Sequence, residues 1–60
     1  AGLTPREREI LGYLGRGHGI AFVAATLVIS ESTVRTHVKS IYKKLGVNGR
    51  EELLAKVDEG

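Results

Sequence analysis

Basic residues recur every four positions in the centre of the chain, and their chemistry suits nucleic acid. Arg35, Lys39 and Lys43 are spaced i, i+4 and i+8, so on a helix they share one face. Ser32 and Thr36 fall on the same face. Arginine and lysine can donate to guanine O6 and N7, and a threonine methyl can pack on a thymine methyl. The pattern favours a helix surface that contacts bases and phosphates.

The distribution of charge points to the same segment. The whole chain has a net charge of +2. Residues 30–50 hold five basic side chains and one acidic one, whereas residues 51–60 hold one basic side chain and four acidic ones. A basic segment in a small domain fits an anionic partner such as nucleic acid. On charge alone, a solvated helix face explains the segment equally well.

Four helices are predicted, and together they make one all-α domain. The chain has 60 residues, so residues 1–60 form a single domain at the small end of the independently folding range. The predicted helices cover about residues 4–15, 19–27, 30–45 and 48–58. No run of residues alternates with a period of two, so no strand is predicted.

Capping residues mark where these helices begin. Thr4 followed three residues later by Glu7 makes a capping box, in which each side chain accepts from the other residue's amide. Ser30 is a favourable N-cap for the third helix. Asn48 with Glu51 repeats the pattern and predicts the start of the fourth helix.

The third predicted helix is the most informative part of the chain. Its apolar residues follow at spacings of four, three and four: Val34, Val38, Ile41 and Leu45. They make a narrow seam for burial, and the basic face lies on the other side of the helix. A turn of three or four residues joins this helix to the previous one. That is the layout of a helix-turn-helix, whose second helix enters the DNA major groove.

The outward residues of this helix divide into expected base contacts and expected backbone contacts. Three lie within the first three turns, where base edges are in reach: Arg35, Thr36 and Lys39. Ser32 and the amides at the helix start are placed for phosphate oxygens, which the helix dipole also favours. Lys43 and Lys44 lie further along, where we expect the DNA backbone.

The sequence resembles the LuxR-type (GerE-like) helix-turn-helix domain of bacterial transcription regulators. The stretches that carry the resemblance are LTPREREIL at residues 3–11, ISESTVRTHV at 29–38, IYKKLGV at 41–47 and Arg50-Glu51. They span nearly the whole chain in the family's order and spacing. The resemblance implies four helices, the third being the recognition helix, and sequence-specific DNA binding as the C-terminal output domain of a regulator.

The resemblance also implies roles for individual residues. Base contacts again fall to Arg35, Thr36 and Lys39, and backbone contacts fall near Ser32, Thr33 and Lys43. His37 resembles a histidine that the family usually has at this position, beside the core seam, where it packs, touches phosphate or does both. The fourth helix in this family often supplies a dimer contact, so three of its residues are candidates for that contact or for the core: Leu53, Leu54 and Val57.

Departures from the family pattern are concentrated in the second helix. The family usually has a serine or threonine cap followed by polar residues, but residues 19–22 here read Gly-Ile-Ala-Phe. Val28 stands in the turn where a glycine is common, and a β-branched residue is strained in a left-handed conformation. We therefore expect a turn of different shape. Phe22 either fills the core or docks against an upstream sensor domain.

Enzymatic and metal-binding functions are not expected. The chain has no cysteine and two histidines, which gives no thiolate ligand and too few ligands for a metal site. The paired acids at Glu7 and Glu9 fit capping and solvent roles better than acid–base catalysis, which needs a cleft. We therefore expect no cofactor and no small-molecule substrate. With no disulfide, leader peptide or membrane-spanning run, the cytoplasm is the default location.

Two other functions compete with this interpretation. A sigma-factor-like promoter-recognition domain shares four helices and similar opening residues, although the tail at residues 45–51 argues against it. A helical protein-interaction module without DNA binding is the alternative from another class. For the DNA-binding reading, the expected partners are double-stranded DNA, a second copy of the chain on DNA, and a sensor domain N-terminal to this segment in a longer protein.

Overall fold

The computed structural model describes the backbone of residues 2–59 and the side chains of residues 2–56. It contains four helices in this order: α1 (Pro5–Gly15), α2 (Ile20–Leu27), α3 (Glu31–Leu45) and α4 (Arg50–Glu59). No strand occurs in the described part of the chain. The all-α, four-helix prediction is therefore confirmed.

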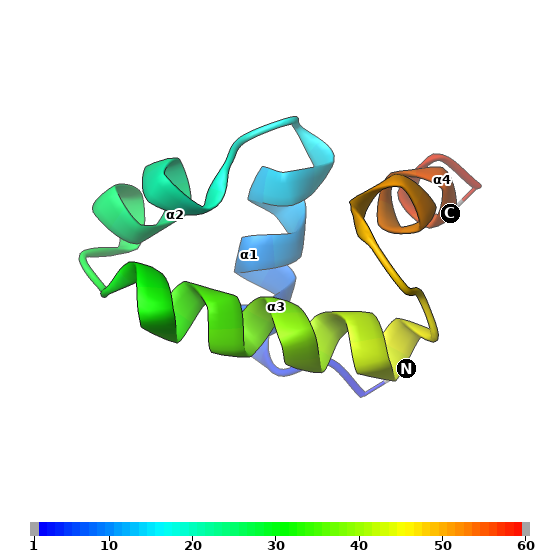
Figure 1. The fold of residues 1–60 in the computed structure, drawn as a ribbon, viewed down its shortest axis with the longest axis horizontal. Coiled ribbons are helices and arrows are strands. Elements are labelled where there is room, and N and C mark those ends of the chain that lie inside the picture. Colours follow the sequence, from blue (N-terminus) through cyan, green and yellow to red (C-terminus); the bar gives the residue numbers. More distant parts are fainter. Residues whose placement is uncertain (1, 60) are drawn as a thin grey trace.

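The longest helix organises the other three. Figure 1 shows α3 running across one side of the molecule, with α1 crossing behind it and α2 beside its first half. α4 follows the end of α3 and packs against α1. The connection between α2 and α3 is short, as a helix-turn-helix requires.

Local capping chemistry sets three of the helix ends. The Glu7 amide donates to Thr4 Oγ1 over 3.1 Å, and the Thr4 amide donates to Glu7 Oε1 over 2.8 Å. Ser30 Oγ accepts from the Thr33 amide over 3.1 Å at the start of α3. Gly46 ends α3 in the left-handed conformation, with φ of 69°, which glycine adopts at little cost. The predicted N-caps Thr4 and Ser30 are confirmed.

The start of α4 differs from the prediction. Asn48 was expected to cap this helix, but α4 begins at Arg50 and the Gly49 carbonyl accepts from the Leu53 amide over 3.1 Å. The reason is tertiary. Val47 is buried in the core, so the chain must leave the core before it can turn into a helix, and Asn48 lies in that connection.

The core is a single cluster with contributions from all four helices and from Val47. Its apolar members are Ile10, Leu14, Val23, Ala24, Val34, Val38, Ile41, Val47 and Leu53. The predicted seam of α3 supplies a third of this cluster, while Leu45 packs against its edge and is half-buried. Since short helices are weak alone, packing of these faces holds the elements in place.

Phe22 lies outside this core. It is 46% exposed, and its ring stacks on the His18 imidazole with centroids 3.9 Å apart. Tyr13 meets the same phenyl ring edge-on at 5.9 Å. The interpretation that Phe22 fills the core is therefore wrong. Val23 and Ala24 take the buried positions on α2, and the half-buried Ile20 packs against the cluster.

The turn between α2 and α3 keeps the left-handed conformation in spite of its β-branched residue. Val28 has φ of 58° and ψ of 48°, and its side chain is 88% exposed. The amides of Val28 and Ile29 both donate to the Ala24 carbonyl, which closes the end of α2. The expectation of a differently shaped turn is wrong, because these hydrogen bonds and the Ser30 cap hold Val28 in a strained conformation.

Replacing Val28 with glycine tests this strain. The left-handed conformation costs an L-residue about 1–2 kcal/mol, and glycine adopts it freely at some entropic cost in the unfolded chain. We expect Val28→Gly to raise the free energy of unfolding by about 1 kcal/mol, and Tm by about 4–8 °C. Val28→Ala keeps Cβ and is the matched control, with a change within about 0.5 kcal/mol. Equal stabilisation by both variants would contradict a backbone origin.

Candidate nucleic-acid interface

The outward face of α3 carries the residues predicted to contact bases. Arg35, Thr36 and Lys39 are all exposed, and Val34 and Val38 on the other side of the helix are buried. Fifteen residues in α3 correspond to a rod about 22 Å long. A helix of this kind fits the major groove, which is about 12 Å wide. α4 packs on α1 and leaves this face open.

The base-contact candidates interact only with their own helix. Arg35 Nη2 lies 3.5 Å from Glu31 Oε1, one turn earlier, and both side chains are more than half exposed. An exposed pair of this kind is weak, so a guanine edge can replace Glu31 as the acceptor. Thr36 Oγ1 donates to the Ser32 carbonyl over 3.1 Å. Lys39 belongs to no ion pair among the described residues.

The start of α3 presents hydroxyl groups next to its free amides. Ser30 Oγ and Thr33 Oγ1 are 2.9 Å apart, and Ser32 and Thr33 are exposed. Hydroxyls and amides at a positive helix terminus suit phosphate oxygens. His37 is half-buried beside the seam, while Lys43 is exposed near the far end of the helix.

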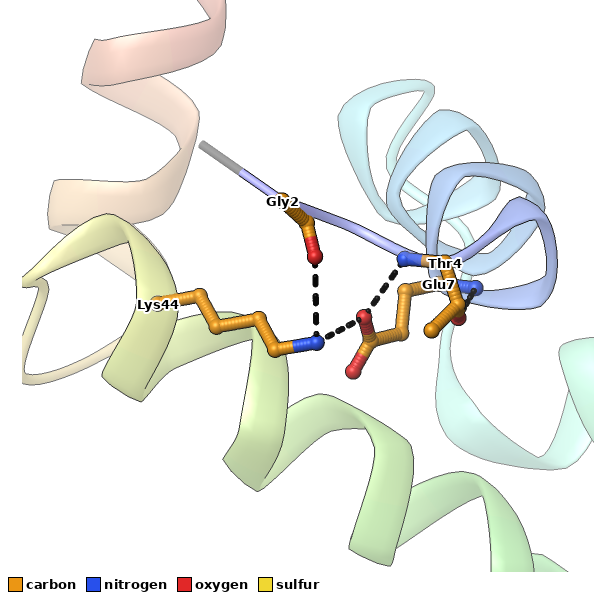
Figure 2. Close-up of polar contacts among 4 residues, drawn as sticks. All are labelled: Gly2, Thr4, Glu7 and Lys44. Carbon is orange, nitrogen blue, oxygen red and sulfur yellow. Dashed lines mark hydrogen bonds and ion pairs between the residues drawn. The ribbon is translucent and has the colours of Figure 1, made fainter.

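Lys44 lies in a different place from its neighbour Lys43. Its ammonium is 2.7 Å from Glu7 Oε1 and donates to the Gly2 carbonyl over 3.3 Å. Figure 2 shows this side chain reaching from the last turn of α3 to the start of α1. The charge predicted for the DNA backbone is thus engaged inside the domain, because Glu7 needs a cation.

Glu7 is an acidic residue on the core-facing side of α1. It is 3% exposed and receives the Thr4 amide as well as Lys44. The Lys44 ammonium is the main cause that lowers the pKa of Glu7 from 4.5 to about 2, and the Ser40 hydroxyl and Thr4 amide act in the same direction. The carboxylate therefore joins three segments: the N-terminal residues, α1 and the end of α3.

A second polar anchor was not predicted from the sequence. Arg50 Nη2 donates to the His18 carbonyl over 2.6 Å and ties the start of α4 to the α1–α2 loop. The two residues are 32 positions apart in the sequence, so no local sequence pattern predicts this contact. For Glu7 a signal existed, since Glu7, Ile10 and Leu14 share one helical stripe and an acid in a buried stripe requires a partner.

The dimer or core candidates of α4 separate in the structure. Leu53 is fully buried and belongs to the core, while Leu54 is half-buried. Val57 lies outside the described side chains. Within the described residues there is no cluster of three potential metal ligands. None of the helices has the length and apolar character needed to cross a membrane.

Comparison with known proteins identifies this arrangement. The family described as "Bacterial regulatory proteins, luxR family" (GerE) matches residues 1–57. The chain belongs to this family. The LuxR-type assignment made from the residues is confirmed, and it takes precedence over the sigma-factor-like and protein-interaction alternatives. The chain is a helix-turn-helix DNA-binding domain of transcription regulators and not an enzyme.

Individual proteins resemble the chain in sequence, and one solved structure resembles it in fold as well. A probable transcriptional regulatory protein NarL of Mycobacterium tuberculosis is 45% identical over 53 residues, covering 88% of this chain and 24% of that protein. The transcriptional regulatory protein MctR of Rhizobium johnstonii is 49% identical over 45 residues, covering 75% of this chain and 21% of that protein. The crystal structure of the response regulator ChrA, from a heme-sensing two-component system, matches with a TM-score of 0.89 and 42% identity over 98% of this chain. This LuxR-family domain spans 29% of the ChrA chain.

The Glu7–Lys44 contact predicts a specific pH dependence of stability. In the unfolded chain Glu7 titrates near its ordinary pKa of 4.5, and in the folded domain near 2. The contribution of the ionised Glu7 to the stability of the folded domain is therefore complete above pH 4.5, and it is lost as the pH falls toward 2. We expect Glu7→Gln to lower Tm at neutral pH, by a margin that shrinks across this interval. Thermal unfolding of both proteins between pH 7 and pH 2 measures it.

The control is Glu9→Gln, which removes an acid whose side chain is 55% exposed on the same helix. Its difference from the unmodified chain should stay small at every pH. A Glu7→Gln deficit that is the same at pH 7 and pH 2 would show that shape, and not charge, accounts for the effect.

Proposed function

We propose that α3 inserts into the DNA major groove and reads base edges through Arg35, Thr36 and Lys39. The observation that carries this proposal is that all three side chains are exposed on the face opposite the buried seam. Arginine and lysine suit guanine, and the threonine methyl suits thymine. Selection of bound duplexes from a random pool is the experiment that tests it, since a reading helix must yield a consensus.

The backbone contacts follow from the two ends of the same helix. Ser32 and Thr33 supply hydroxyls beside the amides at the start of α3, and Lys43 supplies an exposed charge near its end. His37 lies between them, half-buried, with one side on the core seam. For Lys44 we propose a positioning role through Glu7 in place of a phosphate contact.

Two copies are proposed to act together on DNA. Recognition helices of a helix-turn-helix dimer lie about 34–36 Å apart, one turn of the duplex. The domain measures 29 × 21 × 18 Å, so two copies fit side by side at this spacing. Of the three dimer or core candidates in α4, Leu53 is buried and Leu54 is half-buried, so Leu54 is the described candidate with surface left for a dimer contact.

The domain is proposed to be the output part of a longer bacterial regulator in the cytoplasm. It spans between a fifth and a third of NarL, MctR and ChrA, so each of them carries additional chain. ChrA is a response regulator of a heme-sensing two-component system, which supports an upstream sensor or receiver domain here. That domain would set when the α3 face is available to DNA.

Truncation of the base-reading side chains tests the first proposal. We expect Arg35→Ala and Lys39→Ala each to weaken binding to the selected duplex by about 1–3 kcal/mol and to relax the preference at one or more base pairs. Lys56→Ala, an exposed lysine on α4, is the control and should leave the consensus unchanged. If both α3 variants fold normally and retain the full consensus, α3 is not the reading helix.

Lys43→Ala tests the division between base and backbone contacts. Loss of one phosphate contact weakens binding to all sequences alike and reduces the slope of log affinity against log salt by about 1. Titrations at several salt concentrations with the selected duplex and a scrambled duplex measure both quantities. A changed base preference in this variant would contradict its assignment to the backbone.

A further inference from the structure

The outer face of α1 carries a feature that lies outside the proposed α3 interface. Arg8 and Gly12 share one face of this helix, and Arg16, its C-cap, continues the spacing of four. All three are exposed. Ile10 and Leu14, about half a turn away around the helix, are buried in the core. This arginine–glycine face therefore points away from the core side of α1.

Gly12 has no structural reason to be glycine. A Cβ added at this position would meet nothing within 4 Å, and the residue sits inside α1 without a positive φ. Glycine is a poor helix former, so the fold alone favours almost any other residue here. The bare backbone between the two arginines thus calls for an explanation outside the domain's own packing.

Two open hollows flank this glycine. One, of about 290 Å³, is lined by Arg8, Glu9, Gly12, Tyr13 and Arg16. The other, of about 490 Å³, is lined by Arg8, Leu11, Gly12, Gly15 and Arg16. The two hollows share the arginine–glycine face and lie on its two sides. Among the described residues, neither Arg8 nor Arg16 takes part in an ion pair.

We propose that this face docks an acidic amphipathic helix of a protein partner. The two arginines are eight residues apart, about 12 Å along the axis, which matches carboxylates two turns apart on a facing helix. Guanidinium groups bind carboxylates through paired hydrogen bonds. The missing side chain at Gly12 lets an apolar residue of the partner approach the backbone between them.

The lining of the hollows favours protein over a second DNA duplex. Leu11 lines the second hollow and gives an apolar contact that a sugar–phosphate backbone does not need. Because α3 contacts the inner side of α1 through Glu7 and Lys44, the partner and the duplex occupy different sides and can bind together.

The test uses the chain bound to a short DNA duplex, so that the basic face of α3 is occupied. The probe is a helix-stabilised peptide with two glutamates eight residues apart and a leucine midway, compared with the same peptide carrying glutamines. Backbone amide shifts in NMR spectra report where the peptide lies. We expect the glutamate peptide at about 1 mM to shift Gly12 and its neighbours, and the glutamine peptide to leave them in place.

Variants of the chain separate the contributions. Arg8→Gln with Arg16→Gln, or Gly12→Leu to fill the hollows, should weaken the glutamate peptide about tenfold and leave DNA affinity unchanged. Arg6→Gln is the matched control, since Arg6 lines neither hollow and pairs with Glu9. Gly12→Ala adds a Cβ that meets nothing and provides a folded variant of intermediate effect.

Several outcomes would overturn the proposal. These are no shift at Gly12 at that concentration, equal binding of the two peptides, or shifts confined to α3. Shifts at Gly12 caused by excess duplex without peptide would instead identify a nucleic-acid surface. Since the DNA affinity of every variant is measured alongside, failure of this docking site is distinguishable from failure of the α3 interface.

Discussion

The contact between Glu7 and Lys44 fixes the end of the recognition helix to the start of the domain. The carboxylate is 3% exposed, and it receives the ammonium over 2.7 Å together with the Thr4 amide. Moving a charge pair out of water offsets much of the attraction between the charges, so such a pair contributes more to position than to net stability. The hydrophobic effect that drives core packing is non-directional, whereas an ion pair with a fixed hydrogen-bond partner has a set geometry. Glu7 thus sets where α3 ends relative to α1.

Features that depend on local sequence were predictable. The caps at Thr4 and Ser30 act over three residues, and the seam of α3 follows from helical spacing alone. The exposed position of Arg35 follows from the same spacing, because Arg35 falls on the basic face with Lys39 and Lys43 and outside the four-residue seam. The helix ranges of α1, α2 and α3 accordingly lie within one residue of the prediction. The caps, the seam and the helix ranges were therefore enough to predict the all-α fold and the exposed face of α3.

Features that depend on distant partners were not predictable in the same way. Helical spacing places Lys43 on the basic face and Lys44 off it, but the sequence does not show that Lys44 pairs with Glu7, which lies 37 residues away. The start of α4 is displaced because Val47 enters the core. Phe22 shows the opposite error. Its large apolar ring suggests a core residue, but other residues already fill the core. Only the structure shows that this ring is half exposed and stacks on the His18 imidazole.

The side chains proposed to read DNA are separate from those that hold α3 in the fold. Arg35, Thr36 and Lys39 touch only their own helix, through Glu31 or the Ser32 carbonyl where they touch anything described. Among the described residues, the contacts that join α3 to the rest of the domain include the buried seam, the half-buried Tyr42 and Leu45, and the ion pair of Lys44. Changing an outward side chain therefore removes no core contact, and changing an inward one alters no base contact directly. A recognition helix built in this way can acquire a new base preference without a loss of stability.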